Sequence, residues 1–170
     1  MSFQAVSRTV VAAVAAAWLA TTVCRAAGHA PWFQLKTIRG RVVTPHTLRG
    51  RPAVLVVGLS YRSAPPCKKW VIKLSRRTRA QVYQVIVADK PWYIPRFVVM
   101  RRIRDFTPAP FHDRVMIEWQ RAFADRYRVA ESDQPTLFVL DAGGRVLLRL
   151  SGNPTEANLQ RVQRRVNGMK

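Results

Sequence analysis

The chain contains 170 residues, of which 29 are Lys or Arg and 9 are Asp or Glu, for a formal charge of +20. Its apolar share of 48% is ordinary for a protein that buries a core and too high for a solvated disordered chain. The length favours one domain of middling size. Two cysteines, Cys24 and Cys67, exclude a disulfide-stapled miniprotein and a Cys-rich zinc module.

The N-terminal residues have the composition of a targeting segment. Arg8 gives a positive start, and residues 9–24 form an uncharged run rich in Ala and Val. This run is shorter than the roughly 20 apolar residues that a membrane-spanning helix needs. We therefore expect residues 1–30 to be a signal peptide and residues 31–170 to form a periplasmic or secreted domain. An uncleaved membrane anchor and a mitochondrial transit peptide are the alternatives.

Cleavage of this leader would change the thiol content of the protein. Cleavage after Gly28 fits the preference of signal peptidases for small residues. Cys24 would leave with the leader. Cys67 would then be the only thiol of the mature chain, without an internal partner for a disulfide.

The residues after the leader predict a hairpin followed by a strand, a helix and a second strand. Phe33 and Leu35 alternate with polar neighbours, and Gly40 turns the chain into Val42-Val43, which predicts a short β-hairpin. Residues 53–59 are apolar on both faces, as in a central strand covered on both sides. A loop containing Pro65 and Pro66 leads into a helical pattern, and a second buried strand is expected at 82–88.

The next segment, residues 89–131, is broken into pieces by prolines. Its apolar spacing predicts one helix from about 95 to 104 and a second helix from about 113 to 127. Strands are expected at 136–140 and 145–150, joined by a Gly-containing turn.

The last helix has a clear predicted start. Asn153 is expected to cap it, Pro154 to occupy its first position, and Glu156 to serve as the acid of a capping box. Its buried stripe is predicted to be Leu159, Val162 and Val166.

Four separated segments resemble the thioredoxin-like fold, in the branch of TlpA and the peroxiredoxins. They are Phe33-x-Leu35 with Gly40, Leu48-Arg49-Gly50-Arg51-Pro52, Gln134-Pro135-Thr136, and Asp141 with Gly144 and Val146. The resemblance implies an α/β fold with a central mixed sheet flanked by helices, an N-terminal β-hairpin, and a helical insertion before the strand that follows Pro135. In that family the proline at this position is cis and lies opposite the active-site loop, so Pro135 is expected to be the cis-proline.

The sequence departs from the family at the active-site loop. Ala64, Pro65, Pro66 and Cys67 stand where the family usually carries Cys-Pro-Pro-Cys. The resemblance implies that Ala64 replaces the nucleophilic cysteine and that Cys67 matches the more buried resolving cysteine. One thiol cannot form the intramolecular disulfide that completes dithiol exchange.

Cys67 leaves two interpretations open. A one-cysteine peroxidase, or a reductase resolved by an external thiol, is favoured by the positive charges of Arg62, Lys68 and Lys69, which would stabilise a thiolate. A buried and inert cysteine is the competing interpretation. No cofactor is implied, and no metal site is expected, because no ligand spacing links His46 and His112.

Positive charge is concentrated between Arg62 and Arg104, where twelve Lys or Arg residues accompany one acid, Asp89. Surfaces normally mix both signs, so this region predicts a binding surface for an acidic or membrane-associated protein, or for an anionic membrane. Nucleic acid is disfavoured because no recognised nucleic-acid motif is present. An Arg-rich composition on a solvated face is the simpler alternative. We define the basic strip as Arg62, Lys68, Lys69, Lys73, Arg76, Arg77, Arg96, Arg101, Arg102 and Arg104.

A second resemblance concerns the insertion. Trp92, the basic segment 96–104, Pro110 and His112, followed by a helical pattern, are similar to the thioredoxin-like assembly factors of mitochondrial ATP synthase. Those proteins lack the cysteine pair and act as chaperones. The resemblance implies a binding or assembly factor without dithiol chemistry, and a single-cysteine thiol oxidoreductase or peroxidase remains the alternative.

Overall fold

The computed structural model of the chain describes residues 28–88 and 93–168. The expected targeting segment lies outside the described residues, except for its last three positions. The strands are β1 (Gly28–His29), β2 (Leu35–Thr37), β3 (Val42–Val43), β4 (Ala53–Gly58), β5 (Gln81–Val87), β6 (Val115–Glu118), β7 (Thr136–Leu140) and β8 (Arg145–Ser151). The helices are α1 (Ala64–Arg77), α2 (Arg96–Phe106), α3 (Ala122–Arg126) and α4 (Glu156–Asn167), with 3-10 turns η1 (His46–Leu48), η2 (Tyr61–Ser63) and η3 (Ala109–Phe111).

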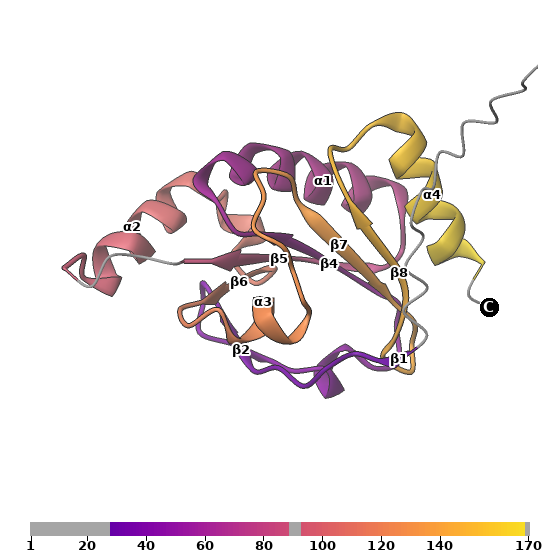
Figure 1. The fold of residues 1–170 in the computed structure, drawn as a ribbon, viewed down its shortest axis with the longest axis horizontal. Coiled ribbons are helices and arrows are strands. Elements are labelled where there is room, and N and C mark those ends of the chain that lie inside the picture. The colour runs from indigo at the N-terminus through magenta and orange to yellow at the C-terminus, as the bar shows by residue number, and fades with distance from the viewer. Residues whose placement is uncertain (1–27, 89–92, 169–170) are drawn as a thin grey trace, which may run out of the picture.

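The strands of the described residues form one mixed sheet, in the order β1-β8-β7-β4-β5-β6-β2-β3 (Figure 1). The strands β4, β5 and β6 are parallel to one another, and β7 and β8 are antiparallel to their neighbours. The expected hairpin is confirmed, because Leu35 of β2 pairs with Val43 of β3. The expected strand, helix and parallel strand are confirmed as β4, α1 and β5.

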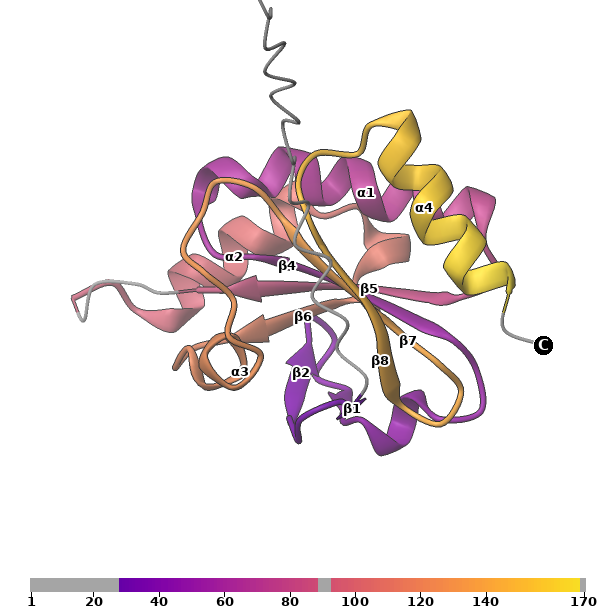
Figure 2. The same ribbon diagram turned by 45° about the vertical axis from the view of Figure 1, so that its right-hand side comes forward.

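The two faces of the sheet bury different clusters. On one face, alternate residues of β4 and β7 pack against α1 and α4 (Figure 2). On the other face, the intervening residues pack against α3 and the N-terminal segment, with Phe123 and Tyr127 stacked at 4.1 Å between ring centroids. This alternation explains why β4 and β7 are buried at every position and contain mainly β-branched and large apolar residues. The buried stripe of Leu159, Val162 and Val166 on α4 is confirmed.

The strand β1 borders the sheet at the β8 edge. Gly28 pairs with Val146 and His29 with Arg145, and the Ala30 amide donates a hydrogen bond of 2.8 Å to the Gly144 carbonyl. The last three residues of the segment expected to be the leader therefore contribute to the sheet.

The expected helix at 113–127 is wrong over most of its length. Residues 115–118 form the buried strand β6, paired in parallel with β5, and only 122–126 are helical. The apolar residues at 115, 117 and 119 recur every second position, which is the period of a strand, and the longer helical pattern concealed it. The helix predicted at 95–104 is confirmed as α2, the expected insertion.

The predicted start of the last helix is also wrong. Thr155 is the N-cap of α4, and its hydroxyl accepts a hydrogen bond from the Asn158 amide at 3.3 Å. The Asn153 side chain is therefore not the cap, and Glu156 is the first residue of the helix. Asn and Thr are both favoured N-caps, so their order in the sequence does not decide between them.

Glu118 is a buried acid that joins β6 to α3. Its carboxylate accepts hydrogen bonds from the backbone amides of Phe123 and Ala124, at the start of α3. Burial raises the pKa of Glu118, and the two backbone hydrogen bonds oppose the shift without cancelling it.

This raised pKa predicts a pH dependence of stability. The folded state holds the Glu118 proton more tightly than the unfolded state, so its contribution is complete below the unfolded pKa and is lost as the pH rises through the raised folded pKa. We expect the free energy of unfolding of the wild type to fall with rising pH relative to that of Glu118→Gln, as measured by urea unfolding from acidic to neutral pH. A difference that stays constant or rises with pH would contradict this assignment.

Candidate functional site

The loop between β4 and α1 is fixed by a pair of serines. The Ser63 amide donates to Ser60 Oγ at 3.0 Å, and the Ser60 amide donates to Ser63 Oγ at 3.2 Å. This reciprocal capping box forms the turn η2, and α1 follows directly. Ala64 is therefore the first residue of a fourteen-residue helix. The resemblance aligns this residue with the nucleophilic cysteine of the family.

Ala64 and Pro65 are exposed at the N-terminus of α1, and Pro66 is half-buried. The expectation that the two prolines lie in a loop before the helix is wrong, because both belong to the first turn of α1. A proline is tolerated there because the amides of the first turn have no acceptor within the helix. The helix N-terminus would stabilise a thiolate at position 64, but Ala64 offers no ionisable group.

Cys67 faces the opposite way, into the core between α1 and the sheet. Its side chain is fully buried, and it is the free cysteine of the described residues. Burial raises the pKa of the Cys67 thiol to about 12, although a hydrogen bond with the Ser63 side chain lowers it in part. Gly58 lies so close that a Cβ there would stand 2.8 Å from Cys67 Sγ. The sulfur is therefore a protonated, enclosed thiol at neutral pH.

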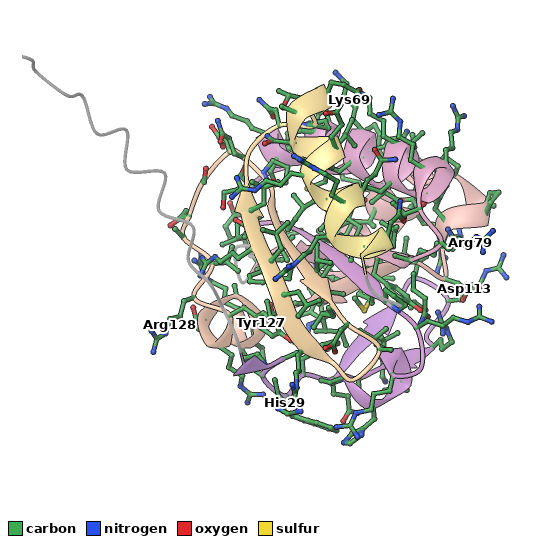
Figure 3. The ribbon with its side chains drawn as sticks, turned by 90° about the vertical axis from the view of Figure 1, so that its right-hand side faces the viewer. His29, Lys69, Arg79, Asp113, Tyr127 and Arg128 are labelled. Carbon is green, nitrogen blue, oxygen red and sulfur yellow. The ribbon has the colours of Figure 1, made fainter. Side chains whose placement is uncertain are left out.

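The cations next to Cys67 in the sequence do not produce the expected thiolate. Lys68 and Lys69 are exposed, and Figure 3 shows Lys69 at the periphery of the molecule. Arg62 is also exposed and pairs with Asp133 at 3.5 Å. The expectation that these three charges favour a thiolate is wrong, because all of them face solvent, whereas the thiol lies on the buried side of α1.

The loop before β7 lies beside the β4–α1 loop. Ser60 Oγ donates to Asp133 Oδ1 at 2.9 Å, in addition to the Arg62–Asp133 ion pair. The register of β4 and β7 pairs Thr136 with Val57, which places Pro135 at the same end of the sheet as η2.

The expectation of a cis-proline at position 135 is wrong. The described residues contain no cis peptide bond, so the bond between Gln134 and Pro135 is trans. The energy difference between the two isomers of such a bond is only about 0.5–1 kcal/mol, and the sequence around Pro135 does not fix it.

The basic strip is exposed at all ten positions. Four of its members have partners: Arg62 has Asp133, Arg77 has Glu156 at 2.6 Å, Lys73 donates to the Pro154 carbonyl, and Arg96 lies 5.4 Å from the Trp119 ring centroid. The remaining members have no ion pair with any carboxylate of the described residues, and they are Lys68, Lys69, Arg76, Arg101, Arg102 and Arg104. The strip is thus divided among η2, α1 and α2, and its unpaired charges face solvent.

The histidines and the large apolar surface residues complete the description. His112 Nε2 lies 2.8 Å from the Thr107 carbonyl, and the His46 ring lies 5.7 Å from that of Trp32. Within 28–88 and 93–168 no cluster of three or more His, Cys, Asp or Glu residues could hold a metal ion. The sequence reasoning missed two exposed aromatic residues on α2, Phe97 and Phe106.

Solved structures with this arrangement are thioredoxin-like proteins, and the chain therefore has a thioredoxin-like fold. A Chlorobium tepidum protein named for thiol:disulfide interchange, DsbE, aligns at 20% identity over 87% of this chain and 99% of that chain, with a TM-score of 0.64. BsSco, of the Sco family of cytochrome c oxidase assembly proteins, aligns at 12% identity over 85% and 95%, with a TM-score of 0.62. The exposed lipoprotein thioredoxin Etrx1 of Streptococcus pneumoniae aligns at 13% identity over 79% and 99%, with a TM-score of 0.59.

Comparison by sequence adds no closer relative. No family model matches the chain, and no curated protein matches it. Among the residues that the structure describes, no helix is long and apolar enough to span a membrane.

The burial of Cys67 predicts low reactivity. In a chain carrying Cys24→Ser, so that Cys67 is the sole thiol, we expect iodoacetamide to alkylate the folded protein at least about a thousandfold more slowly than the unfolded protein at neutral pH. The reason is that a pKa of about 12, raised from 9.0, removes most of the thiolate. Mass spectrometry over time measures both rates. Equal rates, or rapid oxidation of the folded protein by hydrogen peroxide, would instead support a thiol enzyme.

Proposed function

We propose that this chain is an exported thioredoxin-like protein that has lost dithiol exchange and works as a binding or assembly factor for an acidic or membrane-associated partner. The observation that carries the proposal is the pair of positions 64 and 67. The exposed position at the helix N-terminus holds an alanine, and the remaining thiol is buried and protonated. A thioredoxin-like scaffold in this state retains its surface but lacks its electron exchange.

The surface supports a role in binding. Eight cations of the basic strip, all except Arg62 and Arg77, are exposed and have no carboxylate partner among the described residues, so their charge is available to a partner of opposite sign. The likeness to BsSco shows that a protein of this fold can belong to a family of assembly proteins. Export is supported by the composition of the N-terminal residues and by the likeness to an exposed lipoprotein thioredoxin.

A one-cysteine thiol enzyme is the weaker alternative. Such an enzyme needs an accessible thiolate near neutral pH, whereas burial raises the pKa of the Cys67 thiol to about 12. Arg62, Lys68 and Lys69 are too exposed to reverse this shift. The Ser63 side chain is also hydrogen-bonded to the thiol, and a Cβ at Gly58 would stand 2.8 Å from the sulfur, so these two residues enclose it on this side.

Restoring the missing thiol tests the proposal. We expect Ala64→Cys to gain disulfide-reductase activity, with turnover of insulin in the presence of dithiothreitol at least about tenfold above that of the wild type, because residues three apart on a helix lie within disulfide reach. The introduced thiol would stand at the helix N-terminus, which lowers its pKa.

Two variants control for this gain. Ala64→Ser places a polar group of similar size at the same position without a thiol, and it should remain inactive. Ala64→Cys combined with Cys67→Ala has one accessible thiol and should not complete the exchange. If the wild type already reduces insulin at a rate like that of Ala64→Cys, the proposal is wrong.

A further inference from the structure

We propose that one side of α2, formed by Phe97, Arg101 and Arg104, binds the surface of anionic lipid membranes. We call these three residues the Phe97 ridge. This inference rests on the proposed binding function, and it names both the partner and the element that contacts it.

The helix α2 is more exposed than the other long helices. It has no buried residue, whereas α1 and α4 each bury a complete stripe. Its inner side, with Val99, Met100 and Ile103, is only partly buried against the cluster around Ile117. In Figures 1 and 2 the N-terminal end of α2 extends away from the rest of the molecule. Most of its surface is therefore available to a partner.

Helical geometry places the ridge on one side. With about 100° between successive residues, Phe97, Arg101 and Arg104 fall within about 60° of one another. Phe106 lies about 180° from Phe97, on the other side of the same helix. Phe97 is 72% exposed and Phe106 is 69% exposed, so the two phenylalanines differ in direction but not in accessibility.

The composition of the ridge matches an interfacial membrane contact. Helices that lie at a lipid surface combine aromatic side chains with Arg or Lys, because the aromatic ring enters the headgroup region while the cations bind lipid phosphates. Arg101 and Arg104 are exposed and have no ion pair with a described carboxylate. Asp105 is the only acid within α2.

A lipid surface fits the ridge better than a protein does. A stable protein interface buries about 1,000 Å² or more around an apolar centre, and the ridge presents one phenylalanine bordered by arginines. A membrane requires only an inserted side chain and separate cationic contacts that add together. The unpaired cations of α1, including Lys69, extend the attraction beyond the ridge.

Binding to vesicles tests the inference. Full-length protein would be titrated with phosphatidylcholine vesicles with and without phosphatidylglycerol, and the bound fraction measured by sedimentation at two salt concentrations. All variants carry the same N-terminal residues, so any contribution of those residues cancels. We expect Phe97→Ala to weaken binding to the anionic vesicles about tenfold, and Arg101→Gln with Arg104→Gln to weaken it about twentyfold. High salt should weaken it further.

The opposite side of α2 provides a matched control. Phe106→Ala removes an equally exposed phenylalanine of the same helix and leaves its charge unchanged. This variant should bind like the wild type, and all variants should keep the wild-type melting temperature because the substituted side chains are exposed. If Phe106→Ala weakens binding as much as Phe97→Ala does, or if neither weakens it, the inference that the Phe97 ridge contacts the membrane is wrong.

A second probe separates this inference from the proposed function. Binding to polyglutamate without binding to anionic vesicles would overturn the lipid partner and leave an acidic protein partner in place. Vesicle binding that is independent of the ridge would overturn the ridge alone. Failure to bind either probe would overturn the proposed binding function itself.

Discussion

The packing of α1 on the sheet determines both the core and the surface of this protein. Cys67, Trp70 and Leu74 are buried together against β4 and α4. The Trp70 indole donates a hydrogen bond of 2.9 Å to the Gly152 carbonyl, which satisfies a buried donor and connects α1 to the segment before α4. This contact fixes the rotation of α1 about its axis. Once the rotation is fixed, the thiol points inward, whereas Ala64 and the lysines point outward.

The electrostatics of the site follow from this separation. Desolvation acts on the sulfur over its whole surface, while the neighbouring cations are exposed and screened by water. Burial therefore dominates, and the pKa of Cys67 rises to about 12. The same exposure that makes Lys68 and Lys69 ineffective toward the thiol leaves their charges facing solvent. A buried, protonated thiol and an exposed row of cations are thus compatible within one helix.

The sequence predicts the parts of the fold whose residues can form only one structure. The run at 53–58 is apolar on both faces, the runs at 81–87 and 136–140 are mostly apolar, and each is a central strand. Prediction fails where two structures fit the same residues, as at 115–118, where a strand was hidden in a helical pattern. It also fails for Pro135, because the two isomers differ too little in energy for local sequence to decide between them.

The roles of positions 64 and 67 remain expectations from the motif. The burial of the thiol and the exposure of Phe97 depend on tertiary packing, which the sequence did not reveal.

The pairing of β1 with β8 would constrain where an N-terminal leader could be removed. A peptidase cutting after Gly28 would create a new α-ammonium group on His29, directly across the sheet from Arg145. A cut upstream of Gly28 would keep both strand pairs and avoid placing two positive charges side by side at this edge.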